Sequence, residues 1–125
     1  MGSVRDFTEL VAWKQAHEIR KAVYALLGDL PPEEKFNLAS QLRRASTSIA
    51  SNIAEGYGRF HYQENIQFCR QARGSLEEVR DQLMFAKEMQ LLPTKKCDEL
   101  LGKLLECRKV LNGYIRSLEN RKKNS

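Results

Sequence analysis

The sequence lacks a long apolar run and a secretion signal. No stretch approaches the roughly 20 apolar residues that a helix needs to span a bilayer, so we expect no membrane-spanning segment. The first thirteen residues contain neither the charged nor the apolar region of a signal peptide, which predicts a cytoplasmic location. Met1-Gly2-Ser3 has the composition of a cloning remnant, and no inference rests on it.

Cysteine and histidine are scarce, and their positions match no metal or catalytic motif. The three cysteines include no C-x-x-C pair. Cys97 and Cys107 are separated by about 15 Å on one predicted helix, whereas a disulfide needs Cα atoms within about 7 Å. The sequence contains no H-E-x-x-H, no Glu-x-x-His and no G-x-S-x-G. We therefore expect buried thiols, no metal, no cofactor and no enzymatic activity.

Helical periodicity is the main positive signal in the sequence. The chain has 125 residues, of which 42% are hydrophobic, enough for one core. Apolar residues recur at spacings of three and four in four segments, which is typical of amphipathic helices. We predict an all-α fold, an up-down-up-down antiparallel four-helix bundle that forms one domain over residues 1–125. The expected helices cover about residues 8–27, 32–56, 62–89 and 95–120.

Individual residues mark the ends of these helices. Asp6 or Thr8 can cap the first helix, Pro32 suits the first turn of the second, and Thr94 can cap the fourth. Gly56 and Gly58 permit the left-handed backbone angles that often end a helix. Gly74 lies in the middle of the third helix, where glycine costs about 1 kcal/mol relative to alanine, so we expect another backbone to approach closely there.

The stretch from Gln41 to Arg59 differs from an ordinary surface helix. On a helical projection it shows an apolar stripe, a stripe of small residues and a polar stripe. It contains no lysine, and its Ser, Thr and Asn residues are indifferent helix formers, so helix propensity does not account for them. This pattern favours a helix that packs on more than one side. The alternative is a partly exposed helix that is simply rich in serine.

The excess of positive charge lies in the last quarter of the chain. The net charge is +5, and residues 93–125 carry nine basic and four acidic side chains. Such asymmetry favours a polyanionic partner. Lys109, Arg116 and Lys123 recur every seven residues on the expected solvent side of the last helix, and other arginines flank the core side of the third helix. Our candidate contacts to RNA or DNA are Arg59, Arg73, Arg80, Lys109, Arg116 and Lys123.

Several short motifs together resemble a known bacterial family. The motifs are Leu10-Val11-Ala12-Trp13-Lys14 followed by Ala16, Gln41-Leu42-Arg43-Arg44-Ala45, Ser48-Ile49, Asn52-Ile53-Ala54-Glu55-Gly56, and Gly74-Ser75-Leu76-Glu77-Glu78. They resemble the four-helix-bundle proteins encoded in intervening sequences of 23S ribosomal RNA genes. The accessory variability determinants of diversity-generating retroelements use the same fold, and these motifs do not separate the two branches.

The resemblance implies a homopentameric ring, no enzymatic activity, basic surfaces that contact nucleic acid and, in the retroelement branch, binding to a reverse transcriptase. The first three quarters of this chain are nearly neutral, so its charge does not by itself predict a strongly electropositive pore at the centre of such a ring. A second chain would give the central helix a second packing partner. We therefore expect an oligomer interface at Arg43, Arg44, Thr47, Ala50, Ala54 and Glu55. The two arginines would bind carboxylates of a neighbour, such as Glu55 or Glu77, or would bind phosphate instead.

Two functional hypotheses follow. The first is a non-enzymatic, oligomeric accessory protein that binds nucleic acid through its phosphates, without sequence readout, because no groove-reading module is present. The second is an oligomeric scaffold that recruits a protein partner without touching nucleic acid, its basic residues serving solubility.

Overall fold

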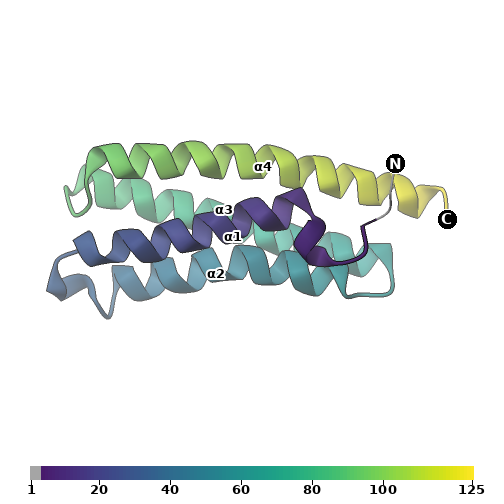
Figure 1. Cartoon of the computed structure of the whole chain (residues 1–125), viewed down its shortest axis with the longest axis horizontal. Helices are drawn as coiled ribbons and strands as arrows, with labels where there is room; N and C mark the ends of the chain where they lie inside the picture. The colour runs from purple at the N-terminus through teal and green to yellow at the C-terminus, as the bar shows by residue number, and fades with distance from the viewer. Residues whose placement is uncertain (1–3) are drawn as a thin grey trace.

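Four long α-helices lie side by side, each antiparallel to the next along the chain (Figure 1). The computed structural model describes residues 4–125, so Met1-Gly2-Ser3 lies outside the described residues. Short 3-10 turns precede and follow the first helix and precede the second (η1 Phe7–Glu9, η2 Leu27–Asp29, η3 Pro32–Glu34). The long helices are α1 Val11–Leu26, α2 Leu38–Tyr57, α3 Tyr62–Glu88 and α4 Thr94–Lys123.

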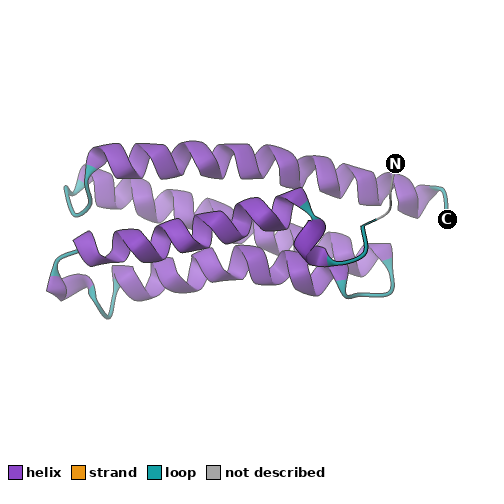
Figure 2. Ribbon diagram, viewed as in Figure 1, coloured by secondary structure: helices purple, strands orange, loops and turns teal. Residues whose placement is uncertain are grey.

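The four helices occupy the corners of a square in chain order, so consecutive helices pack against each other and α1 also packs against α4. The α2–α3 pair has the most extensive contact, and the α1–α4 pair the least extensive. Figure 2 shows only helices and connecting loops, without a strand, over residues 4–125. The prediction of an all-α four-helix bundle is confirmed for the single chain. None of the helices in this range combines the length and apolar character needed to cross a bilayer.

One hydrophobic core runs the length of the bundle. Its fully buried side chains include Ile19, Leu42, Ile66, Leu76 and Leu111. The three cysteines are free and buried in this core, as the sequence predicts. Burial in apolar surroundings raises the pKa of the Cys69 thiol to about 12 and that of Cys107 to about 11, because the charged thiolate is poorly solvated there.

Two predicted helix starts are wrong. Residues 32–37 do not belong to the second α-helix: η3 closes with the bond from Lys35 N–H to Pro32 O, and Asn37 then leaves helical geometry at φ −122° and ψ −94°. The first helix begins at Val11, since Leu10, which precedes it, is extended at ψ 127°. Thr94, the predicted cap of the fourth helix, is instead the first residue of α4, and Pro93 takes the cap position. No side chain caps either of these helices.

Gly56, Gly58 and Gly74 do not have the roles that the sequence predicts. No glycine among the described residues has a positive φ, and the left-handed residue is Gln90, with φ 58°, after the end of α3. Gly56 is needed for space, because a Cβ there would lie 2.7 Å from Asn65 Oδ1 and 2.9 Å from Phe68 Cβ. A Cβ at Gly74 would have nothing of this chain within 4 Å, so the expected close backbone approach at Gly74 is wrong within the chain. The close contact between α2 and α3 occurs at Gly56.

Candidate nucleic-acid interface

A ladder of polar contacts joins the facing sides of α3 and α4. Basic residues of α3 recur at intervals of three or seven, which keeps their side chains on one face. They meet acceptors of α4 at Arg70–Glu119 (3.4 Å), Arg73–Asn112 (2.9 Å) and Lys87–Asp98 (2.7 Å).

Glu77 occupies the centre of this ladder. Its carboxylate accepts hydrogen bonds from Arg80 (2.7 Å) and Arg108 (3.0 Å). The bond from Arg80, followed by the bond from Arg108, holds the pKa of the Glu77 carboxyl below its usual value. Arg73 and Arg80, two predicted nucleic-acid contacts, are therefore held half-buried by acceptors of this chain. Arg73 joins α3 to α4, and Arg80 bonds to Glu77 one turn earlier in α3.

The outer side of α4 presents the other predicted cations to solvent. Lys109, Arg116 and Lys123 are all exposed. Lys109 has a carboxylate of Glu106 at 3.9 Å, whereas Arg116 and Lys123 take part in no ion pair within residues 4–125. Seven-residue steps on a helix advance about 10 Å each, so the three residues span about 21 Å along one side of α4. We call these three residues the α4 row.

The sixth predicted contact, Arg59, lies in the loop between α2 and α3. Its guanidinium carbon lies 4.7 Å from the centroid of the Phe68 ring, a cation–π arrangement that holds the exposed arginine at this end of the bundle. Two nearby aromatics, Phe60 of the loop and Tyr62, the first residue of α3, are exposed, and our sequence analysis did not single them out as binding residues. The signal was present as three successive ring-bearing residues, Phe60, His61 and Tyr62, where a helix begins.

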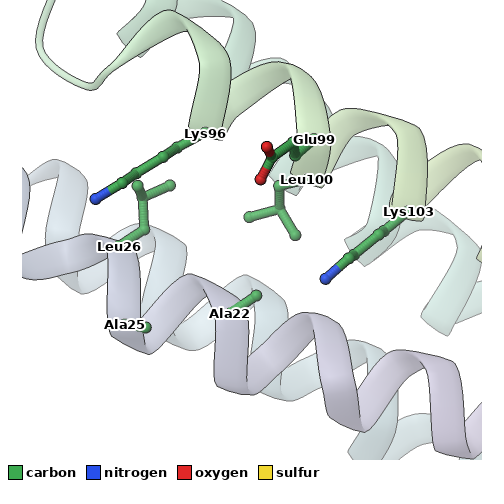
Figure 3. Close-up of a pocket in the computed structure, with 7 residues that line it drawn as sticks. All are labelled: Ala22, Ala25, Leu26, Lys96, Glu99, Leu100 and Lys103. Atoms are coloured by element: carbon green, nitrogen blue, oxygen red, sulfur yellow. The ribbon is translucent and has the colours of Figure 1, made fainter.

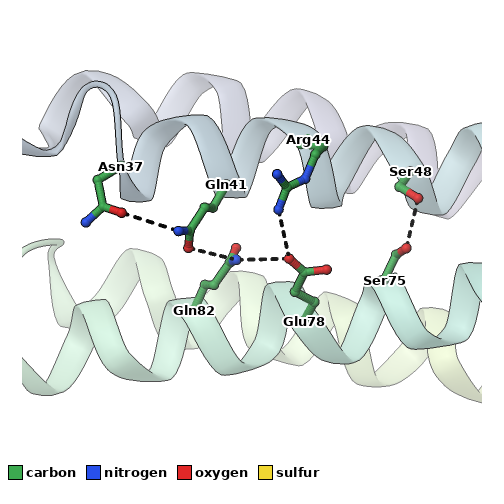
Figure 4. A network of polar contacts seen from close by, with 7 residues as sticks. All are labelled: Asn37, Gln41, Arg44, Ser48, Ser75, Glu78 and Gln82. Carbon is green, nitrogen blue, oxygen red and sulfur yellow. Dashed lines mark hydrogen bonds and ion pairs between the residues drawn. The ribbon is translucent and has the colours of Figure 1, made fainter.

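The polar stripe of α2 faces α3 (Figure 4). Gln82 donates to Gln41 (3.4 Å) and Glu78 (3.3 Å), Arg44 donates to Glu78 (3.4 Å), and Ser75 donates to Ser48 (2.9 Å). These contacts account for Gln41 and Ser48, whose polar side chains let α2 and α3 hydrogen-bond along their outer edges.

The small stripe of α2 turns toward α1. The Arg43 guanidinium lies 5.7 Å from the centroid of the Tyr24 ring of α1, and both side chains border a hollow that Thr47 also lines. Ala50 is fully buried within this chain, so its assignment to an oligomer interface is wrong: no surface of Ala50 is left for a second copy. The two flanks of α2 are covered by α1 and α3, and two-sided packing by itself does not require another chain.

The remaining predicted interface residues stay accessible in the single chain. Arg43, Arg44 and Glu55 are exposed, and Thr47 and Ala54 are half-buried. Arg44 already pairs with Glu78 of its own chain, with 71% and 43% of the two side chains exposed. An exposed pair of this kind contributes at most about 1 kcal/mol, so it would not prevent Arg44 from meeting another partner.

A hollow of about 250 Å³ lies between α1 and α4 (Figure 3). Ala22, Ala25 and Leu26 of α1 line one side, and Lys96 and Lys103 reach across from α4. Lys96 is paired with Asp29 at 2.8 Å. The lining offers no nucleophile with a neighbouring base, and no group of three or more potential metal-ligating side chains occurs within residues 4–125.

Comparisons with known proteins show the family and the fold of this chain. A family model described as 23S rRNA-intervening sequence protein matches residues 8–113. The chain is also similar to the crystal structure of a protein of unknown function from the S23 ribosomal protein family of Bacteroides thetaiotaomicron. That similarity has a TM-score of 0.78 at 22% identity and covers 84% of this chain and 98% of the other, which shows a common fold. No curated protein sequence matches. Arg116 and Lys123 lie beyond the residues that the family model matches.

Proposed function

This chain belongs to the family of 23S rRNA-intervening sequence proteins, and on that premise we propose that it is a non-enzymatic protein that binds nucleic acid through the phosphate backbone. The observation that supports this function most directly is the α4 row. Two of its three cations, Arg116 and Lys123, have no carboxylate of their own chain to neutralise them within residues 4–125. Cations in a straight row attract a polyanion, and the release of condensed counterions adds to the binding free energy.

The proposed contacts position a strand and do not read its sequence. Lysine and arginine on the outer side of a bundle helix reach phosphates, but α4 is packed on α1 and α3 and is not presented as a recognition helix. The arginines of the α3–α4 ladder are bonded to acceptors of this chain and join α4 to α3. Affinity should therefore depend strongly on salt and weakly on base sequence.

The test is binding to RNA and to an RNA–DNA hybrid over a range of salt concentrations. The variant combines Lys109→Glu, Arg116→Glu and Lys123→Glu. We expect at least about a tenfold loss of affinity at low salt, and a salt slope reduced by about one for each lost phosphate contact. The matched control combines Lys14→Glu, Lys35→Glu and Lys95→Glu, three exposed lysines outside any ion pair of residues 4–125, and carries the same net charge.

Three outcomes decide this proposal. A loss confined to the α4-row variant supports it. Equal losses in the two variants would contradict the assignment to α4, because net charge would then account for binding. Absence of binding by the unmodified protein at low salt would reject nucleic-acid binding altogether and would favour the alternative function, a scaffold that recruits a protein partner.

The homo-oligomeric ring, pentameric by resemblance, is part of the same proposal. It is supported by the outer face of α2, where Ser40, Thr47, Ser51 and Ala54 are short and Arg43 and Arg44 are exposed. Short side chains let another helix approach closely. We expect Ala54→Arg to lower the molar mass in light scattering while the helical circular dichroism is retained, with Ser51→Ala as the control. An unchanged mass would remove Ala54 from the interface. The reverse transcriptase partner stays a prediction.

A further inference from the structure

The end of the bundle formed by the α2–α3 loop and the last turns of α4 exposes aromatic rings. Phe60 is 94% exposed and Tyr62 is 39% exposed. The His61 ring packs edge-on against Phe60 with centroids 4.9 Å apart and an interplanar angle of 87°, which steadies the loop and leaves Phe60 open to solvent. Beside these rings lies a hollow of about 440 Å³ whose opposite wall is Lys122 of α4. We call this region the aromatic end.

Basic side chains outnumber acidic ones in the segments that form this end. Residues 58–64 and 118–125 carry four basic side chains and two acidic ones, Glu64 and Glu119. Glu119 is already paired with Arg70 of α3, at 3.4 Å. The four cations take part in no ion pair within residues 4–125; they are Arg59, Arg121, Lys122 and Lys123.

The α4 row ends at this end of the bundle. Lys123 is both the last member of the row and a neighbour in sequence of Lys122, which donates a hydrogen bond to Gln63 beside Tyr62. Adjacent residues of a helix point about 100° apart, so the row and Lys122 place positive charge on two neighbouring sides of the last turn of α4, at the end where the rings are exposed.

From this arrangement we propose that the aromatic end binds single-stranded nucleic acid, with unpaired bases stacked on Phe60 and Tyr62 and the backbone held by the neighbouring cations. This inference rests on the proposed function and adds the substrate class. Aromatic rings within a basic surface form a stacking platform for bases of any sequence. A duplex covers the faces of its bases and would gain only the phosphate contacts. An apolar protein partner would leave the four unpaired cations without complementary charge.

The opposite end of the bundle provides a matched control. Phe36 is 87% exposed, and the Lys35 ammonium lies 5.2 Å from its ring centroid. Glu33 and Glu34 precede it, and residues 29–36 carry three acidic side chains and one basic one, although Asp29 is paired with Lys96 at 2.8 Å. Removing Phe36 removes nearly as much exposed apolar surface as removing Phe60, but in a segment of net negative charge.

The experiment compares an oligouridylate, an oligothymidylate and an RNA duplex of equal length by fluorescence anisotropy. We expect Phe60→Ala to weaken binding of both single strands by about five- to 100-fold, the value of one stacked base, with duplex binding unchanged. Phe60→Trp should keep single-strand affinity because a ring is retained, and Phe36→Ala should bind like the unmodified protein. Oligouridylate carrying 5-iodouridine should crosslink at Phe60 or Tyr62, located by mass spectrometry.

The results separate the two proposals. If the α4-row variant loses affinity for all three probes while Phe60→Ala loses none, the stacking inference is overturned and phosphate binding survives. If Phe60→Ala loses the same affinity for single strands and for the duplex, the stacking inference is also overturned, because only unpaired bases can stack on the ring. If the unmodified protein binds no probe at low salt, both proposals fall and the exposed aromatics are better explained by a protein partner.

Discussion

The two ends of the bundle each expose a phenylalanine outside the long helices, but they differ in charge and in packing. The α2–α3 loop, the segment before α1 and the last turn of α4 lie at the aromatic end, and the α1–α2 and α3–α4 connections lie at the opposite end (Figure 1). Each end exposes one phenylalanine almost completely, Phe60 at the aromatic end and Phe36 at the opposite end. Around Phe60 the cations lack carboxylate partners within residues 4–125, whereas Phe36 follows two glutamates. Exposure of a single aromatic is therefore uninformative by itself, and the charges beside it suggest its partner.

The two ends also differ in how closely their helices pack. At the aromatic end, Gly56 lets α2 touch α3, and Asn65 is buried with its side-chain amide donating to the Tyr114 hydroxyl at 3.1 Å. At the opposite end, a Cβ on Gly28 would meet no atom within 4 Å, and the buried Gln82 has one oxygen without a partner. At these positions the aromatic end is the more closely packed of the two.

The largest expected effect on stability comes from glycine substitution. Gly56→Ala should lower the free energy of unfolding by about 2–3 kcal/mol, because the new Cβ would overlap Phe68 Cβ and push α2 from α3. Gly28→Ala should leave it unchanged or raise it by up to about 1 kcal/mol, since that position is open and its φ is not positive. Urea denaturation followed by circular dichroism measures both. Equal stability of the two variants would remove the claimed difference in packing.

A smaller effect is expected from the buried polar groups. Tyr114→Phe should cost about 1–2 kcal/mol, because the buried Asn65 amide loses its acceptor. Gln82→Leu should change stability by less than about 0.5 kcal/mol: it loses two long hydrogen bonds but also removes an unpaired buried oxygen. Thermal unfolding compares them. If Gln82→Leu loses more stability than Tyr114→Phe, the opposite end would be the more closely packed of the two, contrary to our expectation.

Much of the fold could be predicted from periodicity. Buried positions such as Cys69, Leu76 and Leu83 of α3 recur as the sequence indicates, because a helix must bury one side. Helix starts were less predictable: the residues after Pro32 satisfy the helical pattern, yet Asn37 breaks it by a backbone conformation that no residue in that segment demands.

The candidate site was predictable only in part. That Lys109, Arg116 and Lys123 share one exposed side of α4 follows from their spacing. That Arg73 and Arg80 are held by Asn112 and Glu77 depends on how α3 and α4 are aligned, which spacing within one helix does not contain.

The sequence by itself determined the number of helices, the side that each one buries and the uneven distribution of charge, because these depend on residue type and on spacing along one helix. Only the tertiary structure decided that the flanks of α2 are covered by α1 and α3, that Gly56 is required for close approach, and that Phe60 lies beside Lys122 of α4. These properties arise between residues far apart in the chain, and their distances are set by how the helices pack.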